Sequence, residues 1–204
     1  CYPFIRACEE AGIRPVLGIE FREGNNFRYV GLARNTDGFR RLCALLTRCS
    51  VEDRPIPRTP PPMEDVFFIY RSCPKPLKDF KAHEFLGLRP EELNRLHGSE
   101  ALEYRDRLVA FQPVCFRHED DYRTHQLLRS IDQNIVIGKL DKKNDCASPR
   151  DLFRPPEDLL EAYKLYPDLL QRAEKLLQAC DISWTTGPQN NRETFTGEEA
   201  GLLG

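Results

Sequence analysis

The fold is decided by the stretch Arg14-Pro15-Val16-Leu17-Gly18-Ile19-Glu20, whose apolar residues follow one another almost without interruption. Such a run, bounded by polar residues, is typical of a strand that is buried on both faces of a parallel sheet. An amphipathic helix is predicted directly before it, over residues 2–11, and Gly12 is the kind of residue that ends a helix. A helix that leads straight into a buried strand indicates an α/β protein.

Strands and helices continue to alternate downstream of this stretch. Strands are predicted at 27–33, 66–70, 84–88 and 108–116. Helices are predicted after the cap Asn35-Thr36, after Pro90, over 119–132, and after Pro155 and Pro167. The prolines of 54–62 cannot donate ladder hydrogen bonds, so this segment is predicted to be a stiff surface loop. The order of elements predicts parallel βα units that can close into a barrel.

Two of the predicted helices have a clear apolar side. For the helix over 119–132, we expect four residues to point into the core: Tyr122, Leu127, Leu128 and Ile131. For the helix after Pro167, the expected inward residues are Leu169, Leu170, Ala173, Leu176, Leu177 and Cys180. We expect the last two helices to form a layer of their own.

Charge and composition exclude several classes of protein. The 30 Lys and Arg residues are balanced by 32 Asp and Glu residues, and the resulting net charge of −2 does not suit a stand-alone nucleic-acid-binding protein. Neither an apolar run of about 18 residues nor a signal-peptide pattern occurs, so we expect a cytoplasmic chain. The eight cysteines include no CxxC pair and are expected to be reduced core thiols.

Few residues are candidates for chemistry. Glu20 stands at the carboxyl end of the predicted buried strand, where α/β folds place ligand and metal groups. A site for several metal ions would need convergent His and Asp ligands, and the four histidines are too scattered to supply them. His83 and His97 are expected to face solvent. His125, on the apolar side of its helix, is expected to be a partly buried structural residue.

Three ordered blocks of sequence stand out: residues 11–20 (AGIRPVLGIE), 30–39 (VGLARNTDGF) and 125–132 (HQLLRSID). Together with the two helices that end at Ala179-Cys180, they resemble the PHP domain of the bacterial DNA polymerase III alpha subunit. The resemblance covers roughly residues 1–200. Within the family, the sequence is most similar to the bacteroidete-like form of the subunit, because of Thr196-Gly197 in its tail. Because Cys1 is not an initiator and a helix is already in progress there, we expect an N-terminally truncated fragment.

The resemblance implies a distorted βα barrel of the PHP type, incomplete because its first strand is missing, followed by a helical pair and an extended tail. In some members of the family this barrel binds a metal cluster that supports proofreading. The family's strand-end Glu falls on Glu20, but its metal-binding D-x-H falls on Pro113-Val114-Cys115, and a further His falls on Arg28. A guanidinium cannot ligate a cation. We therefore assign no catalytic residue, and we regard Glu20 as a vestigial metal ligand and Cys115 as the position of a lost one.

The resemblance also implies a division of the chain and a set of partners. Residues 1–140 would be the PHP-like barrel portion, 141–182 a helical connection toward the palm, and 183–204 an extended tail or linker. This scaffold would pack on the polymerase palm of the same chain and contact other replisome subunits, and it would meet DNA only through the parent polymerase. No cofactor is expected in this segment, because the Mg ions of nucleotidyl transfer belong to the palm of the parent polymerase. No membrane contact is expected.

Two other functions stay open at this point. The first is a metal-dependent phosphoesterase or proofreading 3'-5' exonuclease of the PHP class, which would contain stoichiometric Zn, Mn or Fe and would hydrolyse phosphodiesters. The second is a protein interaction module that binds through the proline-rich loop 54–62 or through the helices of 163–180.

Overall fold

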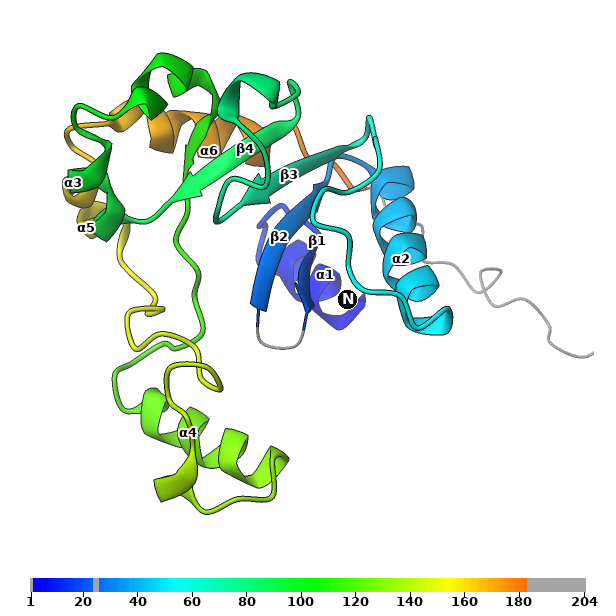
Figure 1. Cartoon of the computed structure of the whole chain (residues 1–204), viewed down its shortest axis with the longest axis vertical. Helices are drawn as coiled ribbons and strands as arrows, with labels where there is room; N and C mark the ends of the chain where they lie inside the picture. Colours follow the sequence, from blue (N-terminus) through cyan, green and yellow to red (C-terminus); the bar gives the residue numbers. More distant parts are fainter. Residues whose placement is uncertain (1, 24–25, 183–204) are drawn as a thin grey trace, which may run out of the picture.

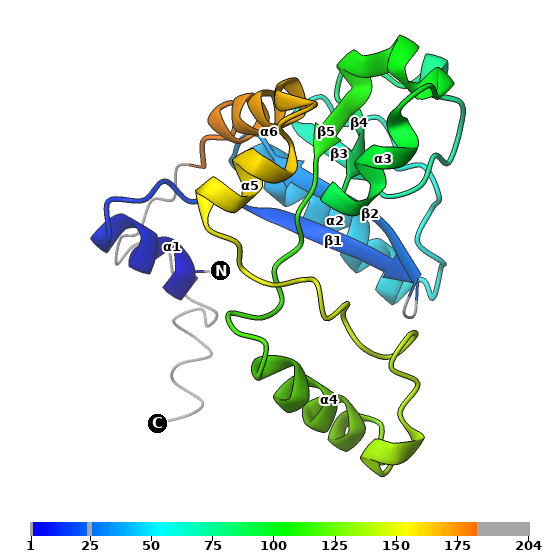
Figure 2. The same ribbon diagram turned by 90° about the vertical axis from the view of Figure 1, so that its left-hand side faces the viewer.

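The computed structural model describes residues 2–23 and 26–182, which form a mixed α/β structure around a five-stranded sheet (Figures 1 and 2). The strands are β1 (Gly18–Glu23), β2 (Asn26–Ala33), β3 (Val66–Tyr70), β4 (Glu84–Leu88) and β5 (Leu108–Ala110). The α-helices are α1 (Tyr2–Glu10), α2 (Thr36–Val51), α3 (Leu93–Leu96), α4 (Asp121–Asp132), α5 (Pro156–Ala162) and α6 (Pro167–Gln178). Short 3-10 helices lie at Leu77–Asp79, Pro90–Glu92, Glu100–Arg107 and Ile137–Lys139. The predicted tail, 183–204, lies outside the described residues.

The sheet is open, and its strands are not all parallel. Their order is β1-β2-β3-β4-β5; β1 and β3 both run antiparallel to β2, whereas β3, β4 and β5 are parallel to one another. The prediction of parallel strands is therefore confirmed for the second half of the sheet and wrong for β1 and β2. Only two residues separate β1 from β2, whereas a parallel pair needs a crossover of a dozen residues or more.

The prediction that the strand after Arg14 is buried on both faces is also wrong. β1 lies at the edge of the sheet, and along it Phe21 is buried whereas its neighbours Glu20 and Arg22 are exposed. Exposure alternates because successive side chains of a strand point to opposite faces and a helix covers only one of them here. Glu20 is consequently on the uncovered face.

The main hydrophobic core lies between α2 and one face of β1, β2 and β3. Tyr29 is fully buried at its centre, where its ring lies 5.0 Å from Phe21 and 5.6 Å from Phe68 between ring centroids. Leu42 and Leu45 of α2 are buried in the same core and cover this face of the sheet. Burial of aromatic and leucine side chains of this size is the main source of stability for such a layer.

The first turn of α2 gives the first testable prediction. The Asn35 side chain caps this helix by accepting a hydrogen bond of 2.8 Å from the backbone N–H of Gly38, as the sequence predicts. Asn35→Ala should lower the free energy of unfolding by about 1 kcal/mol, because one N–H of the first turn loses its partner. Denaturant unfolding checks this, with Asn35→Asp as the control that keeps the cap. An equal loss in both variants would contradict the role of the cap.

A second layer, formed by α5 and α6, covers part of the opposite face of the sheet. Along β3 every residue is buried: Val66, Phe68 and Tyr70 face the core with α2. Phe67 and Ile69 face the other way, toward Leu176 of α6 and Cys180 just after this helix. The expected layer of the last two helices is thus present, and it shares a core with the strands. Of its expected inward residues, Leu177 is exposed.

The segment 112–154, which we call the arm, protrudes from the rest of the molecule, which we call the body (Figures 1 and 2). It carries α4, for which the sequence predicts four inward residues. This is wrong for Leu127, Leu128 and Ile131, each of which is more than half exposed. The buried positions of α4 are Gln126 and Ser130 instead. The physical reason is that α4 does not pack on the sheet, so its apolar side meets no described layer.

The strand predicted at 108–116 ends early, at Ala110. Pro113 cannot donate a ladder hydrogen bond, and Phe116 makes only an isolated bridge with Leu152. The proline-rich loop 54–62 forms no regular structure, as predicted, and Ile56 packs against the main core. None of the described helices is long and apolar enough to cross a lipid bilayer.

Candidate functional site

The structure brings the two predicted site residues, Glu20 and Cys115, into the same neighbourhood. Glu20 lies in β1 and Cys115 in the first part of the arm, and both are exposed. Although Cys115 is exposed as a residue, the partial burial of its sulfur raises the pKa of the thiol, and the negative charges of Asp151 and Glu20 raise this pKa further. The thiol is therefore protonated at neutral pH, whereas the thiolate is the form that binds metals.

Asp151 is a second acidic residue near Cys115, and sequence reasoning missed it. Its carboxylate is buried, with Oδ1 at 2.9 Å from Nη1 of Arg89 and Oδ2 accepting a hydrogen bond of 3.2 Å from the N–H of Ser148. Burial raises the pKa of Asp151, although the positive charge of Arg89 opposes this shift. Nothing local in the sequence reveals the pair, because Arg89 follows β4 and Asp151 stands at the end of the arm.

Each acidic residue around this neighbourhood is engaged by an arginine. The Glu20 carboxylate pairs with Arg22, and the Glu23 carboxylate pairs with Arg28 across the β1–β2 hairpin. Arg28, at the position where the resemblance expects a histidine, is partly buried. The fixed positive charge of a guanidinium that is paired with a carboxylate repels divalent cations from that carboxylate. The acidic groups are thus neutralised within the protein.

The described residues do not fit a metal cluster. Across 2–23 and 26–182, no group of three or more His, Cys, Asp and Glu side chains is arranged to hold a metal ion. The carboxylates that lie near Cys115 carry arginine partners, and the thiol itself is protonated. We therefore derive no reaction step through a metal at this site.

Two of the four histidines, His125 and His83, pack against aromatic rings of the structure. Nε2 of His125 accepts a hydrogen bond of 3.0 Å from the N–H of Ala147, and its ring lies 5.1 Å from the Phe116 ring. Burial lowers the pKa of His125, and the nearby Arg129 lowers it further, so the ring is neutral. The prediction of a partly buried structural histidine is confirmed. His83, predicted to face solvent, is instead half-buried beside Phe68.

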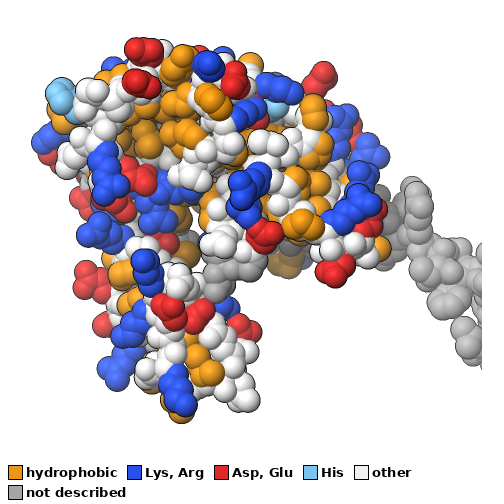
Figure 3. Space-filling view, viewed as in Figure 1, with side chains coloured by type: hydrophobic (Ala, Val, Ile, Leu, Met, Phe, Trp, Pro, Cys, Tyr) orange, Lys and Arg blue, Asp and Glu red, His pale blue; other side chains and the backbone are white. Residues whose placement is uncertain are grey.

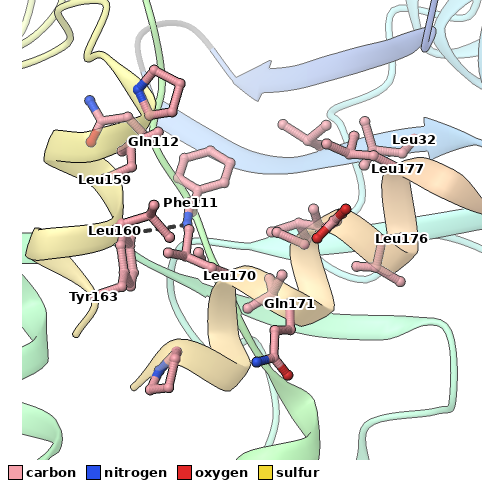
Figure 4. A pocket seen from close by; sticks show the side chains of 18 residues that line it. Leu32, Phe111, Gln112, Leu159, Leu160, Tyr163, Leu170, Gln171, Leu176 and Leu177 are labelled. Carbon is pink, nitrogen blue, oxygen red and sulfur yellow. Dashed lines mark hydrogen bonds between the residues drawn. The ribbon is translucent and has the colours of Figure 1, made fainter. Parts of the chain in front are cut away.

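An apolar groove of about 730 Å³ lies between the sheet and the helices α5 and α6 (Figure 4). Leu32 and Phe111 contribute to its sheet side, and Leu160, Tyr163 and Leu177 to its helix side. The Tyr163 hydroxyl donates a hydrogen bond of 2.7 Å to the carbonyl of Leu88 and accepts one of 3.3 Å from the N–H of Phe111. These bonds fix α5 against the end of the sheet.

Comparison with known proteins gives one consistent result. No family model matches the chain. The chain is 22% identical to DNA polymerase III subunit alpha of Halalkalibacterium halodurans, over 91% of this chain and 19% of that protein. It is 25% identical to DNA polymerase III subunit alpha of two Neisseria meningitidis strains, over 90% of this chain and 20% of each relative.

This chain resembles DNA polymerase III alpha subunits over most of its length. It spans about a fifth of the length of the curated relatives it matches. The resemblance expected from the ordered sequence blocks is thus confirmed at the level of the subunit.

The pairing of Glu20 with Arg22 gives the second prediction. Glu20→Gln should change the free energy of unfolding by less than about 0.5 kcal/mol, because an exposed ion pair contributes little. The variant should also bind no less Zn or Mn than the original chain. Thermal unfolding and metal analysis after dialysis measure both, with Glu23→Gln as the matched control on the same hairpin. A loss of bound metal specific to Glu20→Gln would contradict the assignment of a vestigial ligand.

Proposed function

We propose that this chain is a non-catalytic, PHP-type scaffold segment of a replicative DNA polymerase, the DNA polymerase III alpha subunit. The observation that carries the proposal is the similarity to these subunits along about 90% of the chain. The arginine pairing of Glu20 and Asp151 and the protonated thiol of Cys115 support a degenerate metal site.

In this proposal the open sheet is an incomplete PHP barrel whose first strand belongs to a preceding segment. The edge strands of the described sheet, β1 and β5, are the strands at which a barrel would close. Residues 1–140 supply the barrel portion, 141–182 lead toward the palm, and 183–204 act as a linker. Polymerase chemistry, with its Mg ions and paired aspartates, then belongs to the palm of the parent chain.

The partners follow from the same proposal. The polymerase palm of the same chain is the main one, other replisome subunits are further candidates, and DNA is contacted only through the parent polymerase. The proposed bacteroidete-like origin concerns the tail 183–204 and rests on sequence alone.

The proposal is tested first by sequencing the encoding DNA on both sides of the segment. We expect no His-x-His motif in the upstream flank and a palm with paired aspartates in the downstream flank. An intact upstream His-x-His together with a stop codon shortly after Gly204 would instead make the chain a free-standing PHP-like protein.

A biochemical test addresses the missing metal chemistry. The purified chain should contain no stoichiometric Zn, Mn or Fe and should not hydrolyse bis(p-nitrophenyl) phosphate above a protein-free blank. Stoichiometric metal with hydrolysis that Glu20→Gln abolishes would show a metal-dependent phosphoesterase instead.

A further inference from the structure

The apolar groove between the sheet and α5 and α6 is uncovered in the described part of the chain. On its helix side Leu160 is 64% exposed and Leu177 is 44% exposed, although both line the groove. In Figure 4 Leu160 lies beside Phe111, and Leu177 lies beside Leu32 of the sheet side. Figure 3 shows a different face of the body, on which hydrophobic side chains are mixed with charged ones, whereas the groove lies behind the sheet in that view. Exposed apolar surface like that of the groove marks a binding surface.

The lining of the groove suits a polypeptide segment better than a small polar ligand. Small-molecule sites add a few convergent polar groups to an apolar lining. The Gln112 amide already donates to the carbonyls of Pro113 and Arg150, and the Tyr163 hydroxyl already bonds to backbone groups of the sheet. Polar recognition is therefore confined to the α6 side of the groove, where Gln171 and Glu174 are exposed.

Glu174 indicates the charge of the occupant. It is the one carboxylate among the described residues that line the groove, and the Gln178 amide donates a hydrogen bond of 2.9 Å to it. Among the described residues it has no ion pair with a lysine or arginine. A lysine or arginine on the occupant would therefore complement the negative charge of Glu174 at the α6 side of the groove.

We propose that the groove receives another segment of the same polypeptide, apolar on the side that enters the groove and carrying a lysine or arginine against Glu174. This inference rests on the proposed function, because the relatives are about five times as long as the region they share with this chain. Two separate proteins usually need to bury more than about 1,000 Å² for stable binding. A tethered segment needs far less surface, because its effective concentration is in the millimolar range.

The test compares the 204-residue chain with the longer polypeptide encoded by the same gene. Hydrogen exchange of the amides of α5, α6 and β2 should be about tenfold slower in the longer polypeptide, because the occupant suppresses local opening. Equal exchange in a longer polypeptide that polymerises DNA would overturn the inference while leaving the proposed function intact. Absence of a longer reading frame would overturn both.

Matched variants locate the effect in the groove. Leu160→Glu should speed exchange in α5 and α6 of the longer polypeptide and change nothing in the 204-residue chain. Leu165→Glu is the control, because Leu165 is 73% exposed beside α5 but does not line the groove. Glu174→Lys should act like Leu160→Glu, whereas Glu157→Lys, on the exposed surface of α5, should not.

Two outcomes identify a different occupant and overturn the proposal. If the 204-residue chain sediments as a dimer and its groove amides lose protection on dilution, the occupant is a second copy. If Leu160→Glu and Leu165→Glu have equal effects in the longer polypeptide, the groove is not a docking site.

Discussion

Glu84→Ala should lower the free energy of unfolding by about 3 to 5 kcal/mol, the range expected when one partner of a buried ion pair is removed. Glu84 is buried at the start of β4 and accepts three hydrogen bonds: from the Tyr70 hydroxyl (2.9 Å), from Nζ of Lys75 (2.6 Å) and from the N–H of Lys81 (2.7 Å). Alanine leaves all three donors without this acceptor in the core. Denaturant unfolding measures the loss.

Two controls separate this network from ordinary surface charge. Glu161→Ala removes an exposed carboxylate that pairs with Lys164, and it should cost less than about 1 kcal/mol. The double variant Glu84→Ala with Lys75→Met removes both charges and should recover part of the loss, because no partly buried ammonium is left unpaired. If Glu84→Ala costs no more than Glu161→Ala, the buried network does not stabilise the fold.

The same carboxylate makes stability depend on pH. Burial acts to raise the pKa of Glu84, but the hydrogen bonds from Lys75, Lys81 and Tyr70 outweigh it and hold this pKa below its ordinary value of 4.5. The stabilisation is therefore fully present above pH 4.5 and is lost as the pH falls through the lowered folded-state pKa. The difference in unfolding free energy between the original chain and Glu84→Ala should shrink over that acidic range. If this difference grew on acidification, the expected direction of the pH dependence would be contradicted.

The sequence predicted the strands with the plainest local signal. The bounds of β3 and β4 agree with the predicted 66–70 and 84–88, because each is a short apolar or aromatic run between turn residues. Pro167 correctly marked the start of α6 and Asn35 the cap of α2. These elements depend on local chemistry that a single sequence carries.

The topology depends on contacts between distant residues, and only part of it has a local signal in the sequence. Glycine and asparagine are residue types that favour turns, and their occurrence at 24–25 of the sequence favours a hairpin over a parallel pair. Nothing in the local sequence indicates that the apolar face of α4 is exposed. Helical periodicity at Leu127, Leu128 and Ile131 gives the direction of an apolar side but not whether anything packs on it.

The candidate site could be predicted only in its parts. Glu20 and Cys115 were identified one by one, but their proximity to Asp151 depends on how the arm returns to the body. The pairing of Asp151 with Arg89 joins residues that no motif links. Charge neutralisation by arginines is thus a property of the folded chain, and it is the feature that weighs most against metal binding here.

Leu17→Ala should lower the free energy of unfolding by about 2 to 5 kcal/mol, because the cavity left by a fully packed leucine adds to the lost burial. Leu17 is buried in the main core just before β1, and its carbonyl accepts a hydrogen bond of 2.9 Å from the N–H of Ala33. Since alanine keeps that backbone bond, the loss reports side-chain packing alone. Ile13→Ala is the matched control: Ile13 is 62% exposed, so its removal should cost less than about 1 kcal/mol. Equal losses in the two variants, measured by denaturant unfolding, would place Leu17 outside the core and would mean that the stretch which decides the fold does not pack against α2.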